Sequence, residues 1–256
     1  DSGGKIHVFL NTCRHRGMKV CRYDQGNARV LTCPYHAWSY SVDGNLTTQP
    51  GGLVGVPQFQ AAYHNELDKS QWGLIPVARL INYKGSIWAT WDKNAPDFED
   101  YLGDMKLYLD AVLDHRDGRP GGSEIIGGIQ KWKVPSNWKF GAENFIGDLY
   151  HITSHRSVDM VSIGPSGAGR RDSPIVKQQQ KRPPPFASIG FPNHGHGLIG
   201  NLPHYEEADY VPQFTLTPEV EEYYKHIYHA RVKNLGGQKR GLAAVGTIFP
   251  NLSFHG

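Results

Sequence analysis

The sequence has few cysteines, little excess charge of either sign and no long hydrophobic run. Three cysteines among 256 residues are too few for a disulfide framework. A formal net charge of +3 is too small to favour nucleic acid or an anionic membrane surface as a partner. No apolar stretch is long enough to span a bilayer, and none has the layout of a signal peptide. These absences argue against a disulfide-rich secreted protein and favour a cytoplasmic one.

What the sequence does have is two short segments that each combine one cysteine with one histidine. The first is Cys13-Arg-His15 and the second is Cys33-Pro-Tyr-His36. Two Cys and two His form the ligand set of a Rieske [2Fe–2S] centre, in which two His replace two Cys on one iron. A structural zinc ion also takes Cys2His2 sets, but a zinc finger usually keeps its cysteines in one loop and its histidines in the other. The mixed segments therefore favour the iron–sulfur cluster.

The pattern of apolar residues predicts an α+β protein with two domains. Residues 1–93 are expected to form a small all-β domain, and residues 94–256 a mixed domain of helices and strands. The strands of the first domain are expected at 5–11, 28–32, 38–42, 74–83 and 86–91, with hairpin turns at Asp43-Gly44 and Lys84-Gly85. In the second domain, helices are expected at 97–114, at 138–157 and from Pro218 onward, with strands at 125–135 and 242–253.

A second candidate metal site lies at His151 and His155, in the helix predicted over 138–157. Residues four apart share one face of a helix, so both imidazoles can reach one metal ion. Ile152 stands where a zinc protease needs Glu, and two His with one carboxylate are the ligands of a non-haem Fe(II) oxygenase. Asp148 lies on the same predicted face, where it could orient a histidine or bind the metal itself. Without the cluster segments, ordinary histidines of a surface or core helix would be the better explanation of this pair, and the cluster segments reverse that preference.

Together, the two patterns give a resemblance to the large (α) subunit of Rieske non-haem iron aromatic ring-hydroxylating dioxygenases. Cys13-x-His15 and Cys33-Pro34-Tyr35-His36 are similar to the cluster signature of that family. Glu143-Asn144-Phe145-Ile146-Gly147-Asp148-x-Tyr150-His151 is similar to its catalytic-helix signature. The resemblance covers essentially the whole chain. It implies a Rieske domain followed by part of a helix-grip-like catalytic domain.

The resemblance implies a role for each motif residue. The cluster would be held by Cys13, His15, Cys33 and His36, and a mononuclear Fe(II) by His151 and His155. Asp148 would be the catalytic carboxylate that connects His151 of one chain to His36 of a neighbouring chain. Substrate would lie against Asn144, Phe145 and Ile152, with Phe249 and Leu252 as further candidates.

Two features depart from the family pattern. Its two iron-binding histidines are often separated by four or five residues, whereas three residues separate His151 from His155. Its third iron ligand is an Asp far downstream, and no acidic residue before Gly256 stands at the expected distance. We therefore expect a fragment that lacks both ends, with the third ligand beyond Gly256 and no activity of its own.

The reaction implied by the resemblance adds both atoms of O2 to a mono- or polycyclic aromatic hydrocarbon and yields a cis-dihydrodiol. Electrons from NADH would reach the cluster through a reductase and a ferredoxin, in a homotrimer or an α3β3 assembly with a small β subunit. The alternatives are a Rieske-type monooxygenase or demethylase, a Rieske electron-transfer protein without oxygenase chemistry, and a zinc-stabilised interaction module. His194 and His196, in a glycine-rich segment, are expected to form a structural turn.

Overall fold

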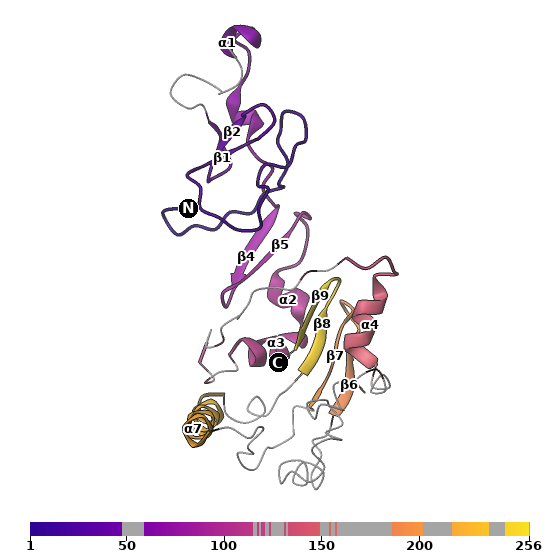
Figure 1. Cartoon of the computed structure of the whole chain (residues 1–256). Coiled ribbons are helices and arrows are strands. Elements are labelled where there is room, and N and C mark those ends of the chain that lie inside the picture. The colour runs from indigo at the N-terminus through magenta and orange to yellow at the C-terminus, as the bar shows by residue number, and fades with distance from the viewer. Residues whose placement is uncertain are drawn as a thin grey trace. The chain divides into compact units, whose positions relative to one another are not determined.

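The structure is a computed structural model that describes residues 1–47, 59–114, 117, 119–120, 123, 131, 133–148, 154, 157, 186–201, 217–235 and 244–255. The chain divides into two compact units, Asp1–Ala95 and Pro96–Gly256, and Figure 1 labels most of their elements. Helices and strands both occur, which confirms the predicted α+β class. No helix in the described ranges is long and apolar enough to cross a membrane.

The first unit is built from short antiparallel strands. In order along the chain, its elements are β1 (Val30–Thr32), β2 (Ser39–Ser41), β3 (Leu46–Thr47), α1 (Phe59–Ala62), η1 (Lys69–Trp72), β4 (Arg79–Tyr83) and β5 (Ser86–Thr90). The strands form a sheet in the order β1-β2-β3 and a separate β4-β5 hairpin. Strands β1, β2, β4 and β5 lie within the ranges predicted at 28–32, 38–42, 74–83 and 86–91, whereas β3 was not predicted. The predicted turns also form, with φ of +88° at Gly44 and +87° at Gly85.

The strand predicted over 5–11 does not form. Phe9 makes only an isolated bridge to Pro76, flanked by hydrogen bonds from Leu10 N to Ile75 O and from Val77 N to Val8 O. Proline has no backbone N–H, so the pairing cannot extend into a regular ladder at this point.

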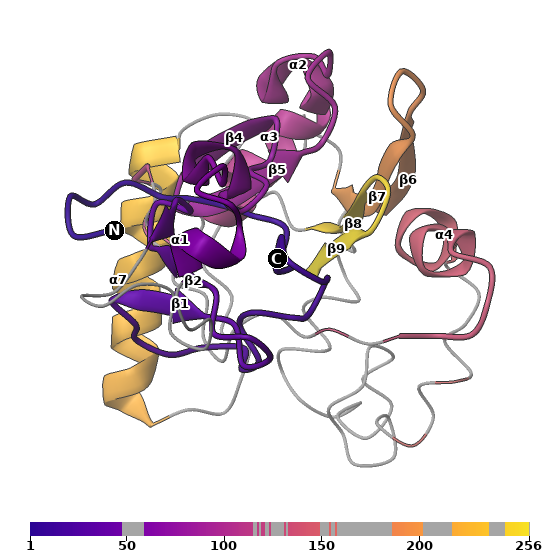
Figure 2. The same ribbon diagram turned by 90° about the horizontal axis from the view of Figure 1, so that it is seen from above.

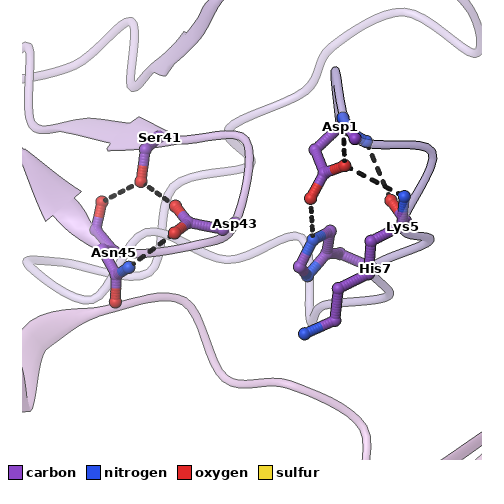
Figure 3. Close-up of polar contacts among 7 residues, drawn as sticks. Asp1, Lys5, His7, Ser41, Asp43 and Asn45 are labelled. Atoms are coloured by element: carbon purple, nitrogen blue, oxygen red, sulfur yellow. Dashed lines mark hydrogen bonds and ion pairs between the residues drawn. The ribbon is translucent and has the colours of Figure 1, made fainter.

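Side-chain hydrogen bonds stabilise the N-terminal segment and the β2–β3 turn, as Figure 3 shows. The Asp1 carboxylate accepts from Gly3 N, Lys5 N and His7 Nε2, each at 2.9 Å. In the β2–β3 turn, the Asp43 carboxylate accepts from Ser41 Oγ and from Asn45 Nδ2. The bond from Ser41 lowers the pKa of Asp43, so the carboxylate remains an acceptor at neutral pH.

The core of the first unit encloses the cysteines of the predicted cluster site. Cys13 and Cys33 pack with Trp38, Tyr40 and Leu46 in one buried cluster that also contains Val20 and Leu74. Trp38 and Tyr40 are the largest of these side chains and are 1% and 0% exposed. The residues that form the core of the first unit are therefore the same ones that surround the two cysteines.

The second unit contains a four-stranded antiparallel sheet in the order β6-β7-β8-β9. Its strands are β6 (Phe186–Phe191), β7 (His196–Asn201), β8 (Ala244–Ile248) and β9 (Leu252–His255). The helices are α2 (Phe98–Leu102), α3 (Met105–Leu113), α4 (Lys139–Gly147) and α7 (Pro218–Leu235). Helix α4 contacts all four strands, and Figure 2 shows it beside the sheet.

Four elements of the second unit differ from their predictions. The helix expected over 97–114 is interrupted at Gly103, where φ is +52°, which gives α2 and α3. The helix expected over 138–157 ends at Gly147. The strand expected over 242–253 is two strands, β8 and β9, separated by a turn. Of the strand expected over 125–135, residues 131 and 133–135 are not in a strand, and 125–130 and 132 lie outside the described residues.

Helix α7 begins at Pro218 as predicted, and Glu221 N donates to the Thr217 carbonyl at 3.0 Å. Three of its apolar side chains are exposed, although they recur at helical spacing. Val220, Tyr223 and Tyr224 are 39%, 50% and 51% exposed. Spacing identifies one side of a helix, but only packing against another element buries that side.

Candidate metal centre

The two cysteine–histidine segments fold into loops with the same backbone hydrogen bonds. In each loop the cysteine N–H donates to the carbonyl of the fifth following residue, and the cysteine carbonyl accepts from the fourth, at 2.8 to 3.0 Å. The fourth residue has positive φ in both loops, +77° at Gly17 and +57° at Ala37. The fifth residues are Met18 and Trp38. Two loops of one conformation therefore present one cysteine and one histidine each.

These loops bring all four predicted ligands together as two like pairs. Cys13 and Cys33 are both 2% exposed, and neither forms a disulfide. They lie in the same buried cluster, close enough for Cys13 to act on the pKa of the Cys33 thiol. The imidazole rings of His15 and His36 lie with centroids 4.6 Å apart in an edge-to-face arrangement. Each pair draws one residue from each loop, which is the arrangement needed when each of two irons takes a like pair.

The protonation chemistry of these side chains fits metal binding. His15 Nδ1 is buried and has no hydrogen-bond partner, so a lone pair is available in the neutral imidazole. Burial lowers the pKa of His15, and His36 and Arg16 act in the same direction, which keeps the ring neutral. Burial raises the pKa of the Cys33 thiol. A buried thiolate therefore needs nearby positive charge, which bound iron would supply.

The arrangement is less suited to a single zinc ion. Within the described ranges, no three or more His, Cys, Asp or Glu side chains are grouped as ligands of one ion. A structural zinc site closes four ligands around one point, whereas a [2Fe–2S] cluster spreads two pairs over two irons. The geometry thus agrees with the cluster that the mixed segments predicted.

Sequence reasoning missed a contribution from Tyr40, which lies in β2 and is fully buried. Its hydroxyl oxygen accepts from Arg14 N at 3.0 Å and lies 3.2 Å from Cys13 Sγ. Because the oxygen already accepts from a backbone N–H, the hydroxyl proton is free to be donated to the sulfur. Burial and the bond to Cys13 raise the pKa of Tyr40, so the hydroxyl keeps this proton. The available signal was a tyrosine in a core strand, since a buried hydroxyl requires a partner.

Aromatic side chains hold the two histidines in place. The Trp38 ring stacks on His15 at a centroid distance of 5.0 Å and an interplanar angle of 9°. Trp72 in turn packs edge-on against the Trp38 ring, at a centroid distance of 5.8 Å and an interplanar angle of 80°. Tyr35 packs on His36 at 3.7 Å and is 58% exposed. His15 therefore packs against a side chain of the core, whereas the His36 side of the site includes an exposed ring.

In the second unit, the residues of the catalytic-helix signature are only partly described. His151, Ile152 and His155 lie outside the described residues. Asp148 is the first residue after α4, with φ of −83° and ψ of 78°, so the prediction that it lies on a helical face is wrong. Its carboxylate accepts a hydrogen bond from Asn144 Nδ2 at 3.2 Å. The amide of Asn144 thus orients Asp148 across the end of the helix.

His196 has the structural role expected of it. It is 2% exposed, and the backbone uses both ring nitrogens. Phe249 N donates to Nδ1 at 3.0 Å, so Nε2 carries the proton and donates to the Tyr101 carbonyl at 2.8 Å. Phe249, a candidate pocket residue, packs its ring against Trp138 at 5.2 Å. The buried imidazole therefore joins α2 to the β8–β9 turn.

Comparisons with known proteins agree with this geometry. Residues 1–60 match the Rieske [2Fe-2S] domain family. The biphenyl dioxygenase α subunit of Paraburkholderia xenovorans (strain LB400) is 46% identical, over 97% of this chain and 52% of its own length. An N,N-dimethyl phenylurea N-demethylase α subunit of Sphingobium sp. (strain YBL2) is 40% identical over 62% of this chain and 33% of its own length.

Among solved structures, naphthalene 1,2-dioxygenase from Rhodococcus sp., bound to indole, superimposes with a TM-score of 0.63 at 36% identity. That match covers 99% of this chain and 52% of the dioxygenase chain. The chain thus spans about half the length of the biphenyl and naphthalene dioxygenase chains it matches. With a Rieske [2Fe-2S] domain at residues 1–60 and similarity along nearly its whole length, the chain is a homologue of the α subunits of aromatic ring-hydroxylating dioxygenases.

Proposed function

We propose that this chain is part of a terminal oxygenase that dihydroxylates a mono- or polycyclic aromatic hydrocarbon with O2 and NADH-derived electrons, giving a cis-dihydrodiol. The observation that carries the proposal is the ligand geometry of the first unit. Two buried cysteines and two neighbouring histidines form like pairs in a chain homologous to biphenyl and naphthalene dioxygenases. Since the chain spans about half of those proteins, the activity belongs to the complete oxygenase.

Residues 1–93 would be the Rieske domain and residues 94–256 part of the catalytic domain. Cys13 and Cys33 would hold one iron of the cluster, and His15 and His36 the other. When bound, the cluster supplies one-electron transfer and a mononuclear Fe(II) supplies O2 activation. The protein buries the two cysteines, keeps His15 neutral and offers the Tyr40 hydroxyl to Cys13 Sγ.

In the catalytic domain, His151 and His155 would bind the mononuclear iron, with a carboxylate beyond Gly256 as the third ligand. Asp148, oriented by Asn144, would accept hydrogen bonds from His151 and from the partner subunit's His36. Asn144, Phe145 and Ile152 would line the substrate site.

The proposed arrangement requires an assembly, either a homotrimer or an α3β3 complex, because one chain's Asp148 would meet its neighbour's cluster domain. A ferredoxin and a reductase would deliver the electrons. We place the reaction in the cytoplasm, because a reducing compartment suits the three cysteines, all of which are free.

A Rieske-type demethylase is the second candidate, because the demethylase α subunit is 40% identical over part of the chain. Its match covers 62% of this chain, against 97% for the biphenyl dioxygenase, and the longer match favours dihydroxylation.

The deciding experiment supplies the full-length oxygenase that carries this sequence with a ferredoxin, a reductase and NADH. Biphenyl, naphthalene and N,N-dimethyl phenylurea are offered separately under 18O2. A cis-diol with both oxygens from one O2 supports the proposal, whereas a single hydroxyl or formaldehyde would refute it. Iron analysis tests the electron-carrier alternative, which predicts only the two irons of the cluster. A colourless protein would support the zinc module instead.

A further inference from the structure

Helix α4 approaches the sheet closely where Ile146 meets Gly197. Gly197 lies in β7, and a Cβ added there would lie 2.6 Å from Cγ2 and 2.9 Å from Cγ1 of Ile146. The Ile146 side chain therefore occupies the space that any larger residue at position 197 would need. Figure 2 shows the helix beside this sheet.

A second contact holds the backbone of the same isoleucine. Ser188, in β6, donates its hydroxyl hydrogen to the Ile146 carbonyl. Carbonyls in the last turn of a helix have no partner within the helix, and α4 ends at Gly147. Strands β6 and β7 are neighbours in the sheet. Two adjacent strands thus fix one residue, β7 through its side chain and β6 through its carbonyl.

The position of Ile146 determines where Asp148 lies. Asp148 follows two residues later and is the first residue outside the helix. Asn144, within the last turn, donates to its carboxylate at 3.2 Å. A shift of this last turn would therefore carry both the backbone of Asp148 and the side chain that orients it.

We propose that Gly197 and Ser188 are positioning residues for Asp148. They hold it in place by fixing the last turn of α4, at Ile146, against the sheet. The catalytic consequence rests on the role proposed above for Asp148. Neither residue is in the helix or in its signature sequence, and neither is assigned to metal or substrate.

The substitution Gly197→Ala tests the contact between Ile146 and Gly197. The cross-strand neighbour Gly190 provides a matched control. Gly190 pairs with Gly197 in the β6–β7 ladder, and a Cβ at Gly190 would have no atom within 4 Å. Neither glycine has positive φ, so alanine suits both backbones. Ile146 is branched at Cβ and has a restricted χ1, so the alanine methyl at position 197 must displace the helix.

In the full-length oxygenase, Gly197→Ala should lower kcat for diol formation about tenfold or more, because misplacements near 1 Å can cost about a hundredfold. KM should change little, since the substrate contacts are not removed. Gly190→Ala should match the wild type in kcat and in cluster absorption. Ser188→Ala should lower kcat in the same way, and Ser188→Thr, which keeps the hydroxyl, should restore it.

An Ile146→Ala background provides the decisive comparison. There the methyl at position 197 has room, so Gly197→Ala should have no further effect on kcat or on unfolding in urea. Equal effects of Gly197→Ala in both backgrounds, or equal effects of Gly190→Ala and Gly197→Ala, would overturn the proposal.

The urea cycle and the EPR spectrum of the nitric oxide adduct of the mononuclear iron need no dihydroxylation. If the wild type forms no diol, the proposed function fails, and these two measurements still decide the positioning. An unaltered nitrosyl spectrum in Gly197→Ala, together with additive unfolding free energies, would refute it.

Discussion

Replacing Tyr40 with phenylalanine should lower the reduction potential of the cluster. The hydroxyl of Tyr40 lies 3.2 Å from Cys13 Sγ and accepts from Arg14 N at 3.0 Å. Phenylalanine keeps the ring in the core but removes the donor to the ligand sulfur. Hydrogen bonds to cluster sulfurs stabilise the reduced state, which carries the extra negative charge. Their loss makes the cluster harder to reduce.

The size of the shift follows from the strength of one hydrogen bond. A bond to a charged group contributes about 1.5–3 kcal/mol, and only the difference between the two oxidation states affects the potential. A difference of about 1 kcal/mol corresponds to ~40 mV for one electron, since 59 mV is a tenfold change. Arg14 N also loses its acceptor, so the unfolding free energy should fall by about 1 kcal/mol or more.

The assay is a redox titration of the full-length oxygenase, followed by the EPR signal of the reduced cluster. Tyr83→Phe serves as the control, because Tyr83 is a buried tyrosine of β4, outside the ligand loops. Its potential should equal that of the wild type. An unchanged or raised potential in Tyr40→Phe would show that the hydroxyl does not donate to Cys13.

Three further outcomes are expected. Gly44→Ala should destabilise the protein more than Gly85→Ala in urea unfolding. Both glycines have φ near +88°, so each substitution costs about 1–2 kcal/mol for backbone strain. A Cβ at Gly44 would also lie 2.5 Å from the Phe9 ring, which adds a steric cost at that site alone. Burial lowers the pKa of His196, so its stabilisation should be complete above about pH 6.5 and lost as pH falls toward the lowered value; unfolding at several pH values should show a weaker acid dependence in His196→Gln. His36→Ala should abolish the visible absorption and EPR signal of the cluster, and retention of both would remove His36 from the ligand set.

Local signals in the sequence predicted those features that depend on a few neighbouring residues. The Asp43-Gly44 and Lys84-Gly85 turns formed, because glycine accepts positive φ without steric conflict. The start of α7 at Pro218 was equally local, since proline suits the first helical position. The predictions failed where distant contacts decide, as at Pro76, which limits pairing with Phe9.

Helix ends were the less predictable feature. Apolar spacing continued through Gly103, but the chain adopts positive φ there and begins a new helix. The spacing also continued beyond Gly147, where α4 stops. Periodicity reports which residues share a face, and it does not report where backbone hydrogen bonding is interrupted.

The sequence by itself determined the chemistry of the cluster site. Two thiols and two imidazoles in mixed segments favour two irons held by like pairs, because ligand type and spacing are local properties of the chain. Only the tertiary structure decided which other groups act on that chemistry. Tyr40 meets Cys13 across 27 residues, and Gly197 receives Ile146 from a separate helix. Such contacts depend on how strands and helices pack, and no spacing rule encodes them.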